Sequence, residues 1–319
     1  MASGRASSLQ VKPLDGPLSA EISGVDLSNV DATTFAQIRQ AWLDNLVLLF
    51  RDQDLTDDQQ MEFSSRFGTL DEVPIVSVGQ KERYNKYISV VSNIIENGVP
   101  VGGLGDDEVF WHSDTSYRER PPSASILYCL EIPKWGGDTS FSNMYLAWET
   151  LDPATRDRIA KMQVKNDTTY TAGGQLRAGF KPIADIRTSP GAVHPMVRTH
   201  PETNLNALNL GRRRNAYAVG LEVEESERLL DKLWEHATQP FLTWTQQWRK
   251  GDVVIWDNRC TMHRRDNFDP HSHRTMHRAQ AQEPTRPVLA EDALSKPPHE
   301  RGQAWMKASG APKGNRPSA

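Results

Sequence analysis

The sequence predicts a mainly β domain with helices at its periphery, and three observations lead to this fold class. Short apolar segments bounded by Gly, Pro and Asn recur along much of the chain, as in the strands of a β-sandwich. A few longer stretches instead carry apolar residues at helical spacing. The chain has 319 residues and no internal repeat, which is long enough to bury a substantial core. We therefore expect one principal domain.

The helices are predicted from apolar spacing and from capping signals. Thr56 and Gln59 form a capping box, and Asp152 stands before Pro153 as an N-cap stands before a proline at the first helical position. Elsewhere apolar side chains recur at spacings of three and four. Helices are expected at residues 31–43, at 56–68, from 152 onward and at 222–236.

The strands are predicted from short apolar runs. Residues 46–50 are all apolar, and a run of this length favours a buried strand over a buried helix. Further strands are expected at residues 87–91, 125–130, 208–210 and 253–256. With amphipathic helices outside them, these strands favour a double-stranded β-helix, the cupin-like jelly roll, with helices on one outer face.

The remaining segments divide the chain. We expect residues 1–10 to be a disordered N-terminus, 11–285 the domain, and 286–319 an arm or disordered tail rich in Pro, Gly, Lys and Ser. Residues 93–108, with four glycines, and residues 171–190 are interpreted as loops, and long loops in a compact domain are usually functional or mobile.

Charge and composition exclude several classes of protein. Lys and Arg number 37 against 41 Asp and Glu, and without a basic block nucleic acid is not an expected partner. No apolar run approaches the roughly 20 residues of a membrane helix, so a membrane is not expected either. The two cysteines, Cys129 and Cys260, are interpreted as reduced thiols of a cytoplasmic protein.

The most informative pattern is a histidine two residues before a carboxylate. If Ser113 is extended, His112 and Asp114 point to the same face, because side chains in a strand repeat with period two. With the distant His263 they have the composition of a 2-His-1-carboxylate facial triad, which leaves open positions on Fe(II). Cys260 is interpreted as a packed side chain, because no C-x-x-C partner is near it.

Two arginines follow the distant histidine. Arg274 and Arg278 are four residues apart, so they share a face whether their segment is helical or extended. Two guanidinium groups facing one cavity require anions, because an unpaired buried charge is costly. A dicarboxylate cosubstrate and an anionic substrate would supply them.

Several motifs occur together in one order, and with them the chain resembles the Fe(II)/2-oxoglutarate-dependent dioxygenases that include taurine dioxygenase and the chlorophenoxyacetate dioxygenases. The resemblance extends from about residue 11 to residue 282. It implies Fe(II) as cofactor, and 2-oxoglutarate and O2 as cosubstrates. Its motifs are Gly24-Val25-Asp26-Leu27, Arg66-Phe67-Gly68, Trp111-His112-Ser113-Asp114, Gly136-Gly137-Asp138-Thr139, His200-Pro201-Glu202-Thr203 and Trp256-Asp257-Asn258-Arg259 through His263.

The resemblance also implies a role for individual residues. His112, Asp114 and His263 match the iron ligands. Arg274 matches the arginine that binds the distal carboxylate of 2-oxoglutarate, and Thr139 matches the threonine that supports it.

Two further matches concern the surroundings of the metal. Trp256 matches a tryptophan near the metal and cosubstrate, although a core aromatic that closes a strand is an equal reading of this residue. Arg278 matches the arginine that pairs with the sulfonate or carboxylate of the substrate. The alternative for Arg278 is a surface ion pair with a nearby acidic residue.

Departures from taurine dioxygenase concern the substrate. Val73-Pro74-Ile75-Val76 replaces a segment that carries a histidine and a tyrosine, and Glu108 replaces an asparagine. An apolar wall favours a hydrophobic body, so we expect Val73 and the 93–108 loop to line the apolar part of an organic anion. A carbon that bears a heteroatom would fragment after hydroxylation. Asp114 argues against halogenation, because a carboxylate occupies the position that a halide would need.

Two other classes of function stay open at this stage. A zinc hydrolase could use the same three ligands with a bound water, but it gives no reason for Thr139 and Arg274. A non-catalytic anion-binding protein is opposed by the intact triad. In each case the expected partner is a small-molecule anion, and we expect a homo-oligomer.

Overall fold

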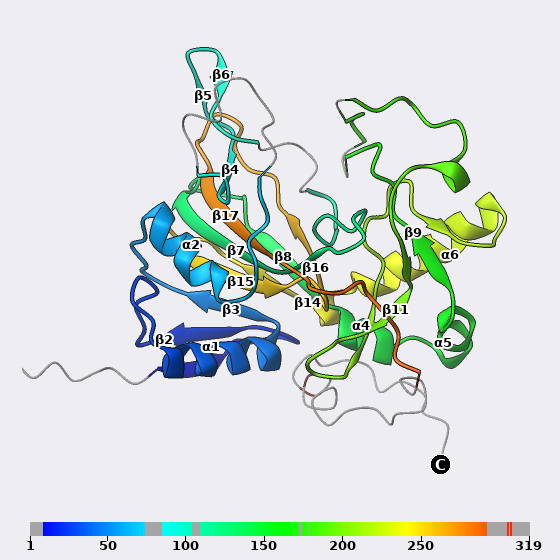
Figure 1. Ribbon diagram of the computed structural model, residues 1–319, viewed down its shortest axis with the longest axis horizontal. Helices are drawn as coiled ribbons and strands as arrows, with labels where there is room; N and C mark the ends of the chain where they lie inside the picture. Colours follow the sequence, from blue (N-terminus) through cyan, green and yellow to red (C-terminus); the bar gives the residue numbers. More distant parts are fainter. Residues whose placement is uncertain are drawn as a thin grey trace, which may run out of the picture.

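Strands form most of the regular structure, and helices flank them (Figure 1). The computed structural model describes residues 9–73, 85–103, 109–171, 174–177 and 179–291, together with residues 305 and 307. The helices are α1 (Ala32–Asn45), α2 (Asp57–Ser65), α4 (Met144–Glu149), α5 (Pro153–Ile159) and α6 (Val223–Ala237), with short 3-10 helices η2 (Ile186–Thr188) and η3 (Pro240–Leu242). The strands are β1 (Gln10–Pro13), β2 (Ala20–Ser23), β3 (Val47–Phe50), β4 (Ser89–Ser92), β5 (Ile95–Glu96), β6 (Val99–Pro100), β7 (Pro122–Glu131), β8 (Thr139–Asn143), β9 (Gln163–Lys165), β10 (Val193–Pro195), β11 (Val197–Thr199), β12 (Asn206–Leu208), β13 (Tyr217–Ala218), β14 (Thr243–Gln246), β15 (Val253–Asp257), β16 (Thr261–Arg265) and β17 (Thr275–Gln282).

Two sheets carry the residues that matter for function. The larger has seven strands in the order β1-β2-β3-β15-β7-β17-β4, and the smaller has three in the order β14-β8-β16. Every neighbouring pair in them is antiparallel except β2 and β3. The mainly β class with peripheral helices is therefore confirmed, and a parallel α/β sheet is excluded.

The two faces of the larger sheet pack against different parts of the protein. Alternate side chains such as Phe50 and Ile255 form one core cluster with Trp42 of α1 and Phe63 of α2. Their neighbours along the strands face the opposite way, as period two requires, and join a second cluster that contains Phe141 of the smaller sheet. The space between the two sheets is thus the centre of the second cluster.

The predicted helix starts are confirmed. Asp31 accepts a hydrogen bond from the amide of Thr34 at the start of α1, and Thr56 and Gln59 form both bonds of the capping box of α2. Asp152 caps α5 in the predicted way. Helix α4 was not predicted, because its side chains are buried almost all round and show no amphipathic period.

Other predictions needed correction. The helices do not share one outer face, because α1 and α2 cover the larger sheet while α4 and α6 pack on the second cluster (Figure 1). The 93–108 segment is not simply a loop, because it contains the β5–β6 hairpin, and its residues 104–108 lie outside the described part. The strand predicted at 208–210 instead ends at Leu208.

The first residues of the predicted tail contact the body of the protein. The amide of Thr199 donates to the carbonyl of Val288 at 2.8 Å, and the amide of Ala290 donates to the hydroxyl of Thr199 at 3.0 Å. Trp305 stacks on Tyr145 with ring centroids 5.7 Å apart. These contacts attach Val288, Ala290 and Trp305 to the body of the protein.

Among the described helices, none has the length and apolar character needed to cross a membrane. Both cysteines are free and buried.

Candidate active site

Two segments far apart in the sequence meet at His112 and His263. The amide of His112 donates to the carbonyl of His263 at 2.9 Å, and the amide of His263 donates back at 2.8 Å. His263 lies on β16, whereas His112 forms an isolated bridge with it outside any named strand. Residues that exchange both bonds in an antiparallel pair project their side chains to the same side. The backbone therefore places the two imidazoles together.

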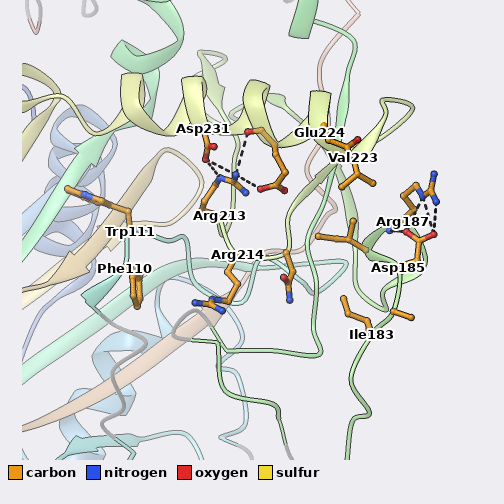
Figure 2. A pocket seen from close by; sticks show the side chains of 14 residues that line it. Phe110, Trp111, Ile183, Asp185, Arg187, Arg213, Arg214, Val223, Glu224 and Asp231 are labelled. Atoms are coloured by element: carbon orange, nitrogen blue, oxygen red, sulfur yellow. Dashed lines mark hydrogen bonds and ion pairs between the residues drawn. The ribbon is translucent and has the colours of Figure 1, made fainter.

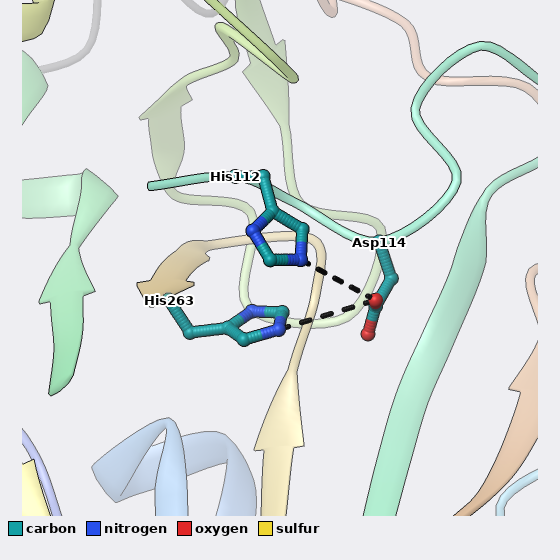
Figure 3. Close-up of side chains that lie close together, drawn as sticks. All are labelled: His112, Asp114 and His263. Carbon is teal, nitrogen blue, oxygen red and sulfur yellow. Dashed lines mark ion pairs between the residues drawn. The ribbon is translucent and has the colours of Figure 1, made fainter. Parts of the chain in front are cut away.

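The three predicted metal ligands converge (Figure 3). The Nε2 atoms of His112 and His263 each lie 3.9 Å from Oδ1 of Asp114. Ligand atoms of the three lie within 4.8 Å of one another, and all three residues are buried. Asp114 follows in a turn rather than in an extended strand, so the expected strand geometry holds only around His112. Two imidazoles and one carboxylate at these distances fit a divalent metal ion.

Hydrogen bonding and packing orient the two imidazoles. Nδ1 of His112 lies 2.7 Å from the carbonyl oxygen of Phe110, and a carbonyl can only accept, so Nδ1 carries the proton and Nε2 keeps its lone pair. The imidazole of His263 packs instead against two aromatic rings. Its ring centroid lies 4.8 Å from that of Trp256 and 6.0 Å from that of Phe141. Among the described residues, Nδ1 of His263 has no hydrogen-bond partner.

At neutral pH the three predicted ligands are in the protonation states that favour metal binding. Burial lowers the pKa of His263 to about 3, and the neighbouring His112 adds to this shift, so the imidazole is neutral. Burial opposes ionisation of Asp114, but Arg278 and the two histidines outweigh it and hold its pKa well below the usual range. Neutral imidazoles and an ionised carboxylate are the protonation states that bind metals.

A small cavity next to His263 gathers the predicted cosubstrate and substrate residues. Thr139, Trp256, Arg274 and Arg278 all line it. The remaining lining residues, which sequence reasoning missed, are Val91, Leu127 and Arg265. This buried wall offers guanidinium groups and a hydroxyl, which are groups that bind carboxylates, beside the predicted metal ligand His263.

The two predicted 2-oxoglutarate residues are fixed by their neighbours. Arg274 is 1% exposed, and its Nη2 donates to the carbonyl of Gly137 at 3.3 Å. The hydroxyl of Thr139 accepts a hydrogen bond from Nε1 of Trp248 at 2.9 Å. Because an indole N–H can only donate, the proton of Thr139 remains available for an acceptor in the cavity.

The two predicted substrate residues have different surroundings. Arg278 donates from Nη1 to Oδ1 of Asp114 at 3.3 Å, so its carboxylate neighbour is a buried predicted ligand and not a surface residue. Val73 is half-buried and is not among the residues that line the cavity. Residues 74–76 and Glu108, which define the departures from taurine dioxygenase, lie outside the described part.

A second, larger cavity of about 950 Å³ lies beside the segment that leads to His112 (Figure 2). It is bordered by Phe110, and Arg187 and Arg213 point at carboxylates on its wall. Arg187 pairs with Asp185 at 2.9 Å, and Arg213 pairs with Glu227 at 2.6 Å. None of the predicted metal or cosubstrate residues lines this cavity, so its size does not make it the active site.

A second buried cluster, His200, Asp257 and Cys260, also has metal-binding atoms close together. Its hydrogen bonds show that it is structural. Nδ1 of His200 accepts from two backbone amides, and Nε2 donates to Asp257 at 3.0 Å. Asp257 is further paired with Arg259 at 2.7 Å. Both ring nitrogens are engaged, so His200 has no lone pair left for a metal.

The chain is similar to known proteins over most of its length. A family model described as Taurine catabolism dioxygenase TauD, TfdA family, matches residues 10–280. The chain is 32% identical over 273 residues to an (S)-phenoxypropionate/alpha-ketoglutarate-dioxygenase of Sphingobium herbicidovorans, covering 83% of this chain and 92% of the relative. It is 32% identical over 274 residues to an alpha-ketoglutarate-dependent sulfate ester dioxygenase of Pseudomonas putida, covering 81% and 84%.

A solved structure is similar to this chain over most of its length. The crystal structure of AAD-2 in complex with Mn(II) and N-oxalylglycine superposes with a TM-score of 0.71 at 29% identity, covering 88% of this chain and 100% of the other. These similarities define an Fe(II)/2-oxoglutarate-dependent dioxygenase, an oxidoreductase that uses O2. The chain belongs to the TauD, TfdA family.

Proposed function

We propose that His112, Asp114 and His263 hold Fe(II), and that the enzyme hydroxylates a small organic anion with an apolar body. The observation that carries this proposal is the convergence of Thr139 and Arg274 on a cavity lined by His263. A zinc hydrolase would have no use for this pair, and the complete set of His112, Asp114 and His263 opposes a non-catalytic anion-binding protein. Family membership sets both alternatives aside.

Each residue has one task in this proposal. When bound, Fe(II) supplies the oxidising chemistry, in which O2 delivers one oxygen atom to succinate, with release of CO2, and the other to a C–H bond. Arg274 and Thr139 hold the distal carboxylate of 2-oxoglutarate through a charge-assisted bond and a neutral one. Arg278 holds the anionic end of the substrate, and Trp256 closes the cavity over His263.

The substrate class is inferred from relatives and from the cavity wall. Relatives are named for phenoxypropionate and for sulfate esters, which are organic anions with a carbon next to oxygen. We infer a carboxylate, sulfonate or sulfate whose apolar body meets Val73 and the 93–108 segment. Hydroxylation next to the heteroatom gives an unstable product that collapses to a carbonyl compound and a released fragment.

Succinate release across a panel of substrates tests the proposal. Aryloxyalkanoates, sulfate esters, sulfonates and N-acyl amino acids are compared with their neutral amides or alcohols. We expect turnover with anions that carry an apolar body and little with the neutral analogues. Equal rates for charged and neutral members would remove Arg278 from substrate binding. Failure to form the weak visible band of Fe(II) with 2-oxoglutarate under anaerobic conditions would contradict the metal site itself.

We further propose that residues 11–285 form a double-stranded β-helix, or jelly roll, with 286–319 as an arm. The facing antiparallel sheets and the family match over 10–280 support this assignment. The free thiols of Cys129 and Cys260 support a cytoplasmic enzyme. A homo-oligomer without nucleic-acid or membrane partners remains our expectation, and light scattering of the purified protein tests the oligomeric state.

A further inference from the structure

A relay of hydrogen bonds ends on Asp114. Nε1 of Trp256 donates to Oδ1 of Asn258 at 3.0 Å, and Nδ2 of Asn258 donates to Oγ of Ser125 at 2.7 Å. The Ser125 hydroxyl in turn donates to Oδ2 of Asp114 at 2.9 Å. Gln280 adds a second donor to Ser125 Oγ at 2.9 Å. Sequence reasoning identified neither Ser125 nor Gln280.

Strand pairing brings these residues together. Ser125 of β7 stands directly opposite Trp256 of β15 on one side and opposite Gln280 of β17 on the other. Asn258 follows β15 by one residue. The relay therefore spans three adjacent strands in the interior of the larger sheet, β15, β7 and β17, each of which is paired on both sides.

The direction of every bond in the relay is determined by chemistry. An indole N–H can only donate, so the carbonyl oxygen of Asn258 must face Trp256 and its amide nitrogen must face Ser125. A serine hydroxyl has one proton and can accept two bonds. Asn258 and Gln280 occupy both acceptor positions, so the Ser125 proton is committed to Asp114.

The relay gives the two carboxylate oxygens of Asp114 different roles. Oδ2 is held by Ser125, whereas Oδ1 lies 3.9 Å from the Nε2 atoms of both His112 and His263. We propose that Ser125, aligned by Asn258 and Gln280, is a positioning residue that keeps Asp114 a one-oxygen metal ligand. This inference rests on the proposed function, in which the triad holds Fe(II).

One-oxygen binding matters because coordination positions are limited. Carboxylates bind metals through one oxygen or through both. A second oxygen of Asp114 on the metal would occupy a position that the two oxygens of 2-oxoglutarate and O2 require. Ser125 is 0% exposed and Trp256 is 1% exposed, so water cannot replace the missing donor in a variant. Loss of Ser125 should therefore weaken 2-oxoglutarate binding more than Fe(II) binding.

The test compares Ser125→Ala with Ser123→Ala in the full chain. Ser123 lies on the same face of β7 and is 4% exposed, but its hydroxyl donates to the backbone carbonyl of Ala281. Fe(II) affinity and the visible band formed on titration with 2-oxoglutarate are measured anaerobically, and the thermal unfolding of each metal-free variant is recorded. Asn258→Leu, of similar size, breaks the relay but leaves Ser125 in place.

We expect Ser125→Ala to bind Fe(II) while its dissociation constant for 2-oxoglutarate rises about tenfold or more, a change comparable to the loss of metal affinity or activity that follows removal of a group orienting a metal ligand. Asn258→Leu should show a smaller rise, and Ser123→Ala should match the wild type. The inference is overturned if Ser125→Ala and Asn258→Leu both bind 2-oxoglutarate as tightly as Ser123→Ala does. If Ser125→Ala does not fold, the same result for Asn258→Leu alone overturns it. A wild-type protein that binds no Fe(II) would overturn the proposed function and the inference with it.

Discussion

His112 and His263 are joined through their backbones by two hydrogen bonds of 2.9 and 2.8 Å. This pairing, rather than contact between the rings, sets the separation of the two imidazoles. Asp114 needs no such support from the far segment, because it follows His112 after one residue. The site is therefore assembled when β16 docks beside the segment that carries His112, and a metal ion would bind to ligands that are already in place.

Replacement of any triad residue tests this assembly. His112→Ala, Asp114→Ala and His263→Ala should each abolish turnover and weaken Fe(II) binding, because each removes one of three protein ligands. The backbone pairing of His112 and His263 does not depend on the side chains, so the three variants should fold. Circular dichroism checks the fold, and metal titration checks the site. Full activity in one variant would exclude that residue from the triad.

Arg274 and Thr139 should contribute unequally to 2-oxoglutarate binding. Loss of a desolvated charged partner typically costs about 2–5 kcal/mol, so Arg274→Ala should raise the KM for 2-oxoglutarate at least about tenfold. Thr139→Val removes one neutral donor and should do less, near 1 kcal/mol. Thr139→Ser retains the hydroxyl and serves as the control. Equal damage from Arg274→Ala and Thr139→Val would mean that the charge is not the main contact.

Gly137 should matter because of its distance from Arg274. A Cβ atom at this position would lie 3.2 Å from Nε and 3.3 Å from Cδ of Arg274, and the backbone φ is +75°. Gly137→Ala should therefore displace the guanidinium and raise the KM for 2-oxoglutarate. Gly98→Ala is the matched control, because Gly98 has a similar φ of +77° but nothing within 4 Å of a new Cβ. If Gly137→Ala binds 2-oxoglutarate as Gly98→Ala does, the contact between residue 137 and Arg274 does not affect cosubstrate binding.

Local signals in the sequence predicted the helix caps and the chemistry of the site. Thr56 and Asp152 cap helices as predicted, because capping depends on residues within one turn. The H-x-D pair identified two members of the triad for the same reason. His263 and Arg274 could be proposed from their residue types, but the task of each and the role of Thr139 required the family resemblance, because nothing local in the sequence specifies which distant segments meet.

Cross-strand neighbours were beyond sequence reasoning. Ser125 and Gln280 meet through the register of β7 and β17, and that pairing contains shifts near both of its ends. A one-residue slip would turn Gln280 to the other face of the sheet. The contact between His200 and Asp257 gave no signal in the sequence either, because the two residues become neighbours only in the folded chain.

The His200–Asp257 pair predicts how stability depends on pH. Burial lowers the pKa of His200 from its usual 6.5, although Asp257 works against this shift. Below pH 6.5 His200 is protonated in the unfolded chain but stays neutral in the folded protein. The free energy of unfolding therefore falls as the pH falls towards the lowered pKa. Burial also lowers the pKa values of His194 and His236.

His200→Gln should be less stable than the wild type, but its free energy of unfolding should fall less than that of the wild type between pH 6.5 and about 5. Denaturant titrations at several pH values give the slope, and an unchanged slope would contradict the assignment.

Arg278 is the residue that we propose to hold the anionic end of the substrate. Its Nη1 lies 3.3 Å from Oδ1 of Asp114, and its side chain is 21% exposed, so it borders both the metal ligands and the cavity. A guanidinium in this position can orient an anion so that one C–H bond faces the metal, and such positioning contributes directly to rate.

Arg278→Gln should raise the KM for anionic substrates and leave Fe(II) and 2-oxoglutarate binding nearly intact, because His112, Asp114, His263 and Arg274 are retained. Consumption of 2-oxoglutarate without product should persist, since the cosubstrate still binds while the substrate is held poorly. The measurement is the ratio of succinate to oxidised product. Arg264→Gln is the control, because Arg264 follows His263 in the chain but is not among the residues that line the cavity. Unchanged KM and an unchanged ratio in Arg278→Gln would show that this arginine serves only its ion pair with Asp114.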